Sequence, residues 1–361
     1  MKVITARNVN DAFKLGVDFF LDKDNYRQQD SRNGTTLEAN EPVTTVYQKP
    51  TERVLFSQKR DANPFFHFIE GLWMLHGRND LRPLTFFVDS MRNFSDDNKT
   101  LWGAYGWRWR DYFDKDQLDI IIAMLKRNPD DRRAVLQMWD VRKDLDKDGK
   151  DVPCNTNIYF KIRDNKLNMT VCNRSNDMIW GTYGANAVHM SMLQEYMATL
   201  IGVEVGVYTQ ISDSFHVYEN DVWERCKQLG VIDIHSWRST KNEYEHIEQK
   251  ELIPLITHSK TFHWELNLFF EAFNDVITTG EKFSTKEYTG PIKTFKNSSI
   301  RDIAIPMVNA YMFHKHRRYE DSYAEINKIK AYDWMTACFD WVRKRDVSYT
   351  LNNTDKGETH G

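Results

Sequence analysis

The chain has 361 residues, which exceeds one typical domain of about 100–200 residues and still fits one large α/β or mixed fold. Hydrophobic residues make up 41% and charged residues 28%, a composition that excludes a disordered scaffold and a membrane protein. The 49 Lys and Arg residues are balanced by 52 Asp and Glu residues, and a net charge of -3 gives no overall attraction for a nucleic-acid backbone. Any anion site must therefore be local.

The cysteines show neither CxxC spacing nor the density of a disulfide framework; they are Cys154, Cys172, Cys226 and Cys338. The N-terminal residues lack the apolar core of a signal peptide, and no stretch approaches the ~20 apolar residues of a membrane helix. We therefore expect reduced thiols, no structural metal and a cytoplasmic protein.

Hydrophobic periodicity and turn signals predict a mixture of helices and strands. Helices are predicted, in chain order, over residues 64–77, 117–127, 187–201 and 331–345, strands over 133–139 and 207–211, and a hairpin over 158–171 that turns at Asp164-Asn165. The polar run 144–151 predicts a surface turn, and 346–361 a frayed polar tail. Because strands and helices mix without regular βαβ alternation, the predicted fold class is α+β.

Cys154 follows Pro153 at the start of the predicted hairpin. A cysteine is most often a small core residue, whereas a reactive thiolate needs cations nearby that lower the thiol pKa. The candidate cations lie beside turns, and they are Arg32, Arg132, Arg133 and Arg174, the last followed by Ser175. Such charges are usually solvated, but four arginines are enough to hold a phosphate through bidentate hydrogen bonds.

Two further features have both a structural and a functional interpretation. Glu70 lies in the most apolar predicted helix, where an unpaired carboxylate costs several kcal/mol, so it is either a buried ion-pair partner or a general acid/base. His216 and Tyr218 point the same way on an extended segment. They either pack in the core or hold a sugar hydroxyl.

Seven segments, in order from about residue 30 to 221, resemble the thymidylate synthase family, which includes the phage pyrimidine hydroxymethylases. They are DSRNGT, HFIEGLWMLHG, LWGAYGWRWR, DDRRAVLQMWD, PCNTNIYFKIRDNKL, NRSNDMIWG and FHVYEND. The resemblance implies a mixed sheet layered with helices, a sheet face that forms the interface of a homodimer, and one catalytic domain over residues 1–345. We expect no metal and no membrane, and no nucleic acid is required.

The same resemblance assigns roles by motif. Cys154 matches the nucleophile that adds to C6 of a pyrimidine, so that C5 attacks the one-carbon unit of the co-substrate 5,10-methylenetetrahydrofolate. The resemblance assigns Arg32, Arg174 and Ser175 to the nucleotide phosphate, and Arg132 and Arg133 to the phosphate in the neighbouring subunit. It assigns His216 and Tyr218 to the ribose 3′-hydroxyl, Glu70 to proton transfers and Tyr105 to the catalytic cavity. Asp177 and Gly181 are assigned to the folate ring, and Asp177 also to catalysis, where it assists proton removal.

Departures from the synthase pattern bear on the product. Asn155 follows the nucleophile where the synthase usually has His, and the RSND segment resembles that of a phage deoxycytidylate hydroxymethylase. Asp213 lies three positions before His216, whereas the synthase motif has two. The tail DKGETHG lacks the apolar C-terminal signature that closes over the substrates in the synthase. These features favour addition of water to the exocyclic methylene, which gives a hydroxymethyl product, over hydride transfer, which gives methyl.

One side-chain amide is expected to recognise the base through hydrogen bonds. In the synthase, the Asn that hydrogen-bonds uracil follows the matching glycine by four residues, but four residues after Gly181 this chain has Ala185. If one residue is inserted in TYGAN, Asn186 is the residue that recognises the base, and uracil is favoured. A flipped amide would accept cytosine instead. We therefore expect hydroxymethylation of dUMP, with dCMP as the alternative base; thymidylate synthase and a non-catalytic nucleotide- or RNA-binding relative are the alternative functions.

Overall fold

The computed structural model describes residues 1–31, 34–233, 243–248, 251–283 and 295–347, without the side chains of residues 229–233. The chain divides into two compact units, the first made of residues 1–61 and 67–246 and the second of residues 62–66 and 247–361. Among the described residues, no helix has the length and apolar character needed to cross a membrane. One catalytic domain over residues 1–345 stays a prediction.

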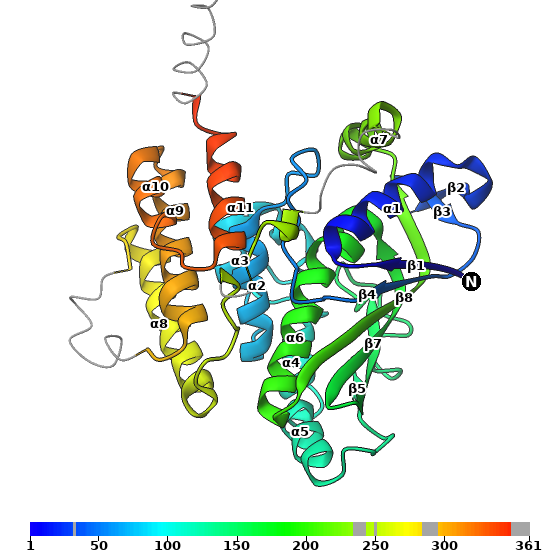
Figure 1. Ribbon diagram of the computed structural model, residues 1–361, viewed down its shortest axis with the longest axis horizontal. Helices are drawn as coiled ribbons and strands as arrows, with labels where there is room; N and C mark the ends of the chain where they lie inside the picture. The colour runs from blue at the N-terminus through cyan, green and yellow to red at the C-terminus, as the bar shows by residue number, and fades with distance from the viewer. Residues whose placement is uncertain (32–33, 234–242, 249–250, 284–294, 348–361) are drawn as a thin grey trace, which may run out of the picture. The chain divides into compact units, whose positions relative to one another are not determined.

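The first unit is built on an eight-stranded mixed sheet with the order β1-β4-β8-β7-β6-β5, to which β3 pairs at β8 and β2 at β3 (Figure 1). The strands are β1 (Lys2–Ala6), β2 (Tyr26–Ser31), β3 (Gly34–Ala39), β4 (Val43–Tyr47), β5 (Val135–Gln137), β6 (Asn155–Arg163), β7 (Lys166–Asp177) and β8 (Glu204–Tyr218). The pairs β1–β4 and β7–β8 are parallel and the others antiparallel. This mixed sheet, together with its helices, confirms the α+β class.

The predicted hairpin is formed by β6 and β7, which pair in one register from Arg163 and Lys166 back to Asn157 and Cys172, where an irregularity shifts the register before Asn155. Its turn residues Asp164 and Asn165 have φ of 50° and 58°, as the two-residue type I′ turn requires. The turn thereby fixes which side chains of both strands face the helices.

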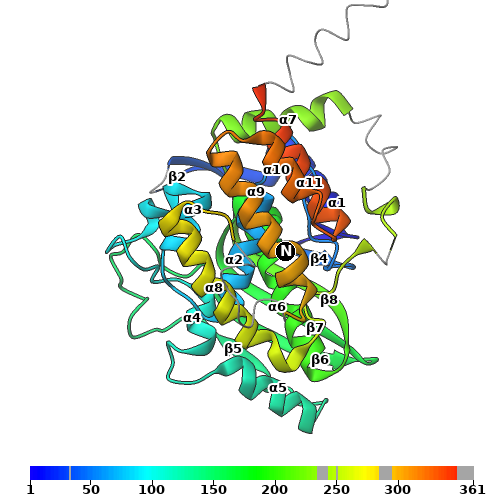
Figure 2. The same ribbon diagram turned by 90° about the vertical axis from the view of Figure 1, so that its left-hand side faces the viewer.

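Helices of the first unit cover one face of the sheet, where α1 contacts β1 and β4 and α6 contacts β7 and β8 (Figures 1 and 2). The helices are α1 (Val9–Leu21), α2 (Pro64–His76), α3 (Arg82–Phe87), α4 (Tyr105–Arg110), α5 (Gln117–Arg127), α6 (Asn186–Ile201) and α7 (Asp221–Asp233), with short turns η1 (Lys23–Asn25), η2 (Asp89–Phe94), the π-helical η3 (Met178–Ala185) and η4 (Glu243–Glu245). The first turn of α2 belongs to the second unit. Gly77 and Gly202, with φ of 85° and 95°, end α2 and α6 in a conformation that favours glycine.

The prediction of a surface turn over residues 144–151 is wrong at its first residue. Asp144 is buried, whereas Leu145, Asp146 and Asp148 are exposed. The polar composition of the run gave no sign of this burial, because it depends on Arg108, which lies 36 residues earlier and comes from α4. The strands predicted at 133–139 and 207–211 are confirmed, the first shorter as β5 and the second longer as β8.

The second unit is helical. It contains η6 (Ser259–Thr261), α8 (Phe262–Thr279), η8 (Ser299–Ala304), α9 (Ile305–Lys315), α10 (Tyr319–Ile326) and α11 (Tyr332–Arg343). Phe65, Tyr311 and Trp341 pack as an aromatic cluster with ring centroids 5.4–5.8 Å apart, which ties α9 to α11. The helix predicted at 331–345 is confirmed as α11, and residues 348–361 of the predicted tail lie outside the described residues.

Candidate active site

Cys154 lies immediately before β6, and Arg174 of β7 holds it from the neighbouring strand. The backbone N–H of Arg174 donates to the Cys154 carbonyl at 2.9 Å, and its Nη2 lies 3.8 Å from the Cys154 Sγ. The guanidinium also donates to the carbonyls of Pro153 at 2.9 Å and Val152 at 3.1 Å. A fixed cation beside a partly exposed thiol favours the thiolate.

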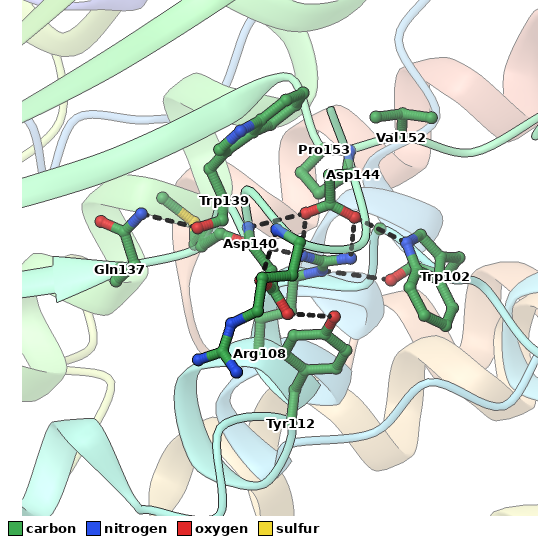
Figure 3. A network of polar contacts seen from close by, with 12 residues as sticks. Trp102, Arg108, Tyr112, Gln137, Trp139, Asp140, Asp144, Val152 and Pro153 are labelled. Carbon is green, nitrogen blue, oxygen red and sulfur yellow. Dashed lines mark hydrogen bonds and ion pairs between the residues drawn. The ribbon is translucent and has the colours of Figure 1, made fainter. Parts of the chain in front are cut away.

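The loop before Cys154 is anchored by a buried ion pair between Arg108 of α4 and Asp144 (Figure 3). Arg108 donates to both Asp144 oxygens, at 2.6 and 3.0 Å, and to the Met138 carbonyl at 2.6 Å. Although burial alone would raise it, these hydrogen bonds keep the pKa of Asp144 below its usual value. The network fixes the segment that carries Trp139, whose ring lies 5.6 Å from the Arg174 guanidinium carbon.

Glu70 of α2 is buried close to His189 of α6, with 3.2 Å between Oε2 and Nε2. Burial, assisted by the negative charge of Asp151, raises the pKa of Glu70 to about 8, and burial lowers the pKa of His189 to about 3. Both groups are therefore neutral at pH 7, and neither of these two atoms has a hydrogen-bond partner among the described residues. The distance alone would suit an ion pair, but with these pKa shifts the two groups meet as neutral side chains rather than as a charged structural pair.

Tyr105, the first residue of α4, reaches the start of β6. Its hydroxyl accepts a hydrogen bond from the Asn155 N–H at 3.3 Å, and burial together with the neighbouring Cys154 raises its pKa. Asp151 lies in the same region, where its Oδ2 accepts from the Gly103 N–H at 2.7 Å. The negative charge of Asp151 raises the pKa of both Glu70 and Tyr105, so both of these predicted site residues lie near Asp151, and Tyr105 also lies near Cys154.

Asp177 ends β7 and caps the π-helical segment η3. Its Oδ1 accepts from the Trp180 N–H at 2.5 Å, while its buried Oδ2 has no partner among the described residues. Burial raises the pKa of Asp177. Arg60 donates to the Ile179 carbonyl at 2.9 Å and stacks 4.1 Å from the half-exposed Trp180 ring. The unpaired Oδ2 of Asp177 and the half-exposed ring of Trp180 therefore belong to residues only three positions apart.

Asn186, the first residue of α6, reaches the strand residue next to the thiol. Its Oδ1 accepts from Asn155 Nδ2 at 3.4 Å, and its Nδ2 donates to Asn176 Oδ1 at 3.1 Å. The preceding segment η3 is π-helical, with non-helical angles at Gly184, and a π-helical turn accommodates one more residue than an α-helical turn. This local geometry fits the predicted one-residue insertion and brings Asn186 to Asn155.

His216 and Tyr218 lie on β8 beside the end of β7. Their ring centroids are 5.4 Å apart, and His216 is the register partner of Asp177, as Ser214 is of Ser175. His216 Nδ1 also lies 3.2 Å from the Ser214 carbonyl oxygen. The residues predicted to hold ribose therefore lie next to those predicted to hold phosphate and folate.

The remaining predicted arginines do not join this cluster within the described part of the chain. Arg133 pairs with Asp131 at 2.7 Å, and its side chain is 81% exposed. Val135 pairs with Tyr159, so Arg133 lies opposite Lys161 in the same antiparallel register. Lys161 is seven residues from Cys154 along β6, a distance of roughly 23 Å at ~3.3 Å per residue. Arg132 is exposed beside it, and Arg32 lies outside the described residues.

Sequence reasoning missed four residues of the cluster, namely His189, Asp151, Arg60 and Asn176. A signal existed for His189, because it follows Asn186 by three residues, and residues three apart share a helix face. The other contacts join segments that are distant in sequence or depend on a strand register. Among the described residues, no group of three or more His, Cys, Asp or Glu side chains is arranged to hold a metal ion.

Comparison with known proteins shows the family of the chain. The thymidylate synthase family model matches residues 22–261. The chain belongs to the thymidylate synthase family. This family member is 44% identical over 356 residues to a protein of Pseudomonas phage M6 named deoxyuridylate hydroxymethyltransferase, a match that covers 97% of this chain and 96% of that protein. The resemblance inferred from the seven segments is confirmed.

Two further matches cover part of the chain. The chain is 41% identical over 199 residues to the deoxyuridylate hydroxymethyltransferase of Bacillus phage SP01, which covers 52% of each protein. The crystal structure of thymidylate synthase from phage T4 matches with a TM-score of 0.49 and 23% identity, over 60% of this chain and 79% of that one.

Proposed function

We propose that this chain is a folate-dependent enzyme that hydroxymethylates C5 of dUMP, with 5,10-methylenetetrahydrofolate as the one-carbon donor. The observation that carries the proposal is the 44% identity, over 97% of the chain, to the phage M6 deoxyuridylate hydroxymethyltransferase. The chain shares the family of one-carbon transferases over residues 22–261. The site contains a nucleophile, an acid and an amide reader, as such a reaction needs.

Cys154 is the nucleophile that adds to C6 of the pyrimidine. Arg174, with Nη2 at 3.8 Å from its Sγ, stabilises the thiolate and holds the nucleotide phosphate together with Ser175 and Arg32. Addition of sulfur to C6 makes C5 nucleophilic, and C5 then forms a bond to the one-carbon unit. His216 and Tyr218 hold the 3′-hydroxyl, and Tyr105 lines the cavity through its contact with Asn155.

Glu70 moves protons in this scheme. With a pKa of about 8, its carboxyl group carries a proton at neutral pH and can donate it within a buried site, as a general acid must. The folate side is formed by Asp177, Gly181 and the half-exposed Trp180, because the buried and unpaired Oδ2 of Asp177 offers a hydrogen-bond acceptor to a polar ring. The folate co-substrate supplies the carbon that C5 attacks.

The hydroxymethyl product requires water at the exocyclic methylene. Asn155 Oδ1 is buried beside the nucleophile and has no partner among the described residues. Such an atom supports an ordered water molecule, since buried waters bind to polar groups that the protein leaves unpaired. This observation favours water over hydride as the group that completes the reaction.

The homodimer belongs to the same proposal. The sheet face opposite α1 and α6 carries Thr170, Cys172, Thr209 and Ile211, which are only half-buried in one chain. Central strands of a sheet normally have a covering layer, and a second copy of this face would provide one. Arg132 and Arg133, roughly 23 Å along the sheet from Cys154, would then reach the partner's phosphate.

Product masses test the proposal. Purified protein is incubated with methylenetetrahydrofolate and dUMP, dCMP or CMP in parallel, and the nucleotide products are analysed by mass spectrometry. We expect a hydroxymethyl product from dUMP, which carries one more oxygen than a methyl product. A methyl product would identify a thymidylate synthase instead, and dCMP as the preferred substrate would refute the choice of base.

The nucleophile provides the control. Cys154→Ser is expected to keep dUMP binding and to lose turnover, because an alcohol is a far weaker nucleophile than a thiolate at neutral pH. If wild-type protein binds dUMP but gives no product, the chain is a non-catalytic nucleotide-binding relative.

A further inference from the structure

The amides around Asn186 form one continuous buried chain of hydrogen bonds. Asn155 Nδ2 donates to Asn186 Oδ1 at 3.4 Å, Asn186 Nδ2 donates to Asn176 Oδ1 at 3.1 Å, and Asn176 Nδ2 donates to Ser212 Oγ at 3.0 Å. All four side chains are buried. The chain thus joins the neighbour of the nucleophile to the centre of the sheet through the predicted base reader.

The fold leaves room for this chain at one glycine. A Cβ on Gly181 would lie 2.4 Å from Asn176 Oδ1 and 3.4 Å from Asn186 Nδ2. Since non-bonded carbon and oxygen atoms need more than 3 Å, a side chain at this position would break the bond between the two amides. Close approach of η3 to β7 at Gly181 therefore permits the link.

The hydrogen bonds of this amide chain can form in either of two directions. An amide carries a donor and an acceptor of nearly equal size, and a hydroxyl can donate or accept. If all three amides flip and the Ser212 hydroxyl rotates, three hydrogen bonds form again, each with its donor and acceptor exchanged. The two directions differ at the end of the chain, where Asn155 leaves Oδ1 unpaired in one and would leave Nδ2 unpaired in the other.

Each direction presents a different face of Asn186 to a base. One lone pair of its Oδ1 and one hydrogen of its Nδ2 remain beyond the two bonds of the chain. Uracil offers an acceptor at O4 beside a donor at N3–H, whereas cytosine offers a donor at its 4-amino group beside an acceptor at N3. Reversing the chain therefore exchanges a uracil reader for a cytosine reader.

Resting on the proposed function, we propose that Asn155 and Asn176 are positioning residues that tie the orientation of the Asn186 amide to the direction of the whole hydrogen-bond chain, and that the direction with Asn155 as donor selects uracil over cytosine. Neither residue touches the base in this scheme. Both act through Asn186, because a site that hydrogen-bonds one base strongly rejects the base whose donors and acceptors are exchanged.

Two substitutions test the direction with opposite expectations. Asn155→Asp replaces the donor to Asn186 Oδ1 by a group that only accepts, so that Asn186 must turn its Nδ2 toward it. The ratio of kcat/KM for dUMP to that for dCMP is expected to fall by about 10-fold or more. Asn176→Asp places an acceptor where Asn176 already accepts, and it is expected to keep or increase that ratio.

Asn173→Asp is the matched control. Asn173 is buried, pairs with Asn155 in the β6–β7 register and bonds the Ile211 carbonyl rather than the amide chain. The same loss of an amide next to the chain is expected to lower activity or stability without changing the dUMP to dCMP ratio. If Asn155→Asp does not fold, Asn155→Ser takes its place, because it removes the amide without adding a charge. The dUMP to dCMP ratio of kcat/KM in Asn155→Ser is expected to fall about 3-fold.

Equilibrium dissociation constants for dUMP and dCMP are measured beside the kinetics, and circular dichroism confirms folding. A folded Asn155→Asp or Asn155→Ser protein with the wild-type ratio would overturn the proposal, as would a fall of the ratio in Asn176→Asp equal to that in Asn155→Asp. If wild type gives no hydroxymethyl product, the proposed function fails, while the binding ratios still decide the role of the amide chain.

Discussion

Removal of Asp144 should reveal how strongly the loop before Cys154 depends on one buried charge. Asp144 accepts two bonds from Arg108, one from Trp102 Nε1 at 2.8 Å and one from the Asp140 N–H at 2.8 Å. In Asp144→Leu, the guanidinium of Arg108, which is 0% exposed, has no carboxylate partner. Breaking a buried pair in this way costs ~3–5 kcal/mol.

For a domain of about 200 residues, each kcal/mol lowers Tm by about 2–4 °C, so Asp144→Leu is expected to lower Tm by about 6–20 °C. Thermal unfolding followed by circular dichroism measures this change. The exposed Asp146 of the same turn supplies the control, because Asp146→Asn should change Tm by about 2 °C or less.

The double variant Arg108→Leu/Asp144→Leu isolates the cause. Since replacing both members of a buried pair by apolar residues is often neutral or stabilising, the double variant should regain most of the stability that Asp144→Leu loses. A Tm of Asp144→Leu within 2 °C of wild type, or a double variant less stable than Asp144→Leu, would refute this reasoning.

Three other predictions concern charges at the site. Because burial raises the pKa of Glu70 from 4.5 to about 8, the folded chain loses stability through this group as pH rises from about 4.5 to 8. Glu70→Gln should therefore gain Tm over wild type at pH 8 and not at pH 4.5, and an equal difference at both pH values would contradict the buried acid. Arg174→Lys keeps the charge but loses the planar donor fork to Pro153 and Val152; kcat/KM should fall about 10- to 100-fold, and full activity would show that the fork is not needed. Mixed dimers of Arg132→Ala/Arg133→Ala chains with Cys154→Ser chains should recover activity at one site in a complementation assay, and no recovery would rule out shared sites.

Much of the fold was predictable because local signals suffice for local structure. Pro64 and Gly77 mark α2 to within one residue, and the alternation about Asp164 and Asn165 gives the β6–β7 hairpin. Helix ends, turn angles and the alternation of apolar and polar residues along a strand depend on residues that are close together in the sequence.

The site was predictable only in part. The motifs predicted Cys154, Glu70 and Asn186 as candidate site residues, whereas the burial of Asp144 and the link from Asn155 through Asn186 to Asn176 required the structure. Such contacts join residues 10 to 36 positions apart, and no local pattern reports them.

The sequence by itself determined the α+β class, the family and the residue types that the chemistry needs, since these follow from motifs that are contiguous in the chain. Only the tertiary structure decided which of those side chains meet and in which state of protonation. Burial of Glu70 by α2 and α6 makes it a neutral acid, and the register of β7 against β6 sets Arg174 beside the thiol. Desolvation and strand register are properties of the packed chain, because each depends on what surrounds a residue in space.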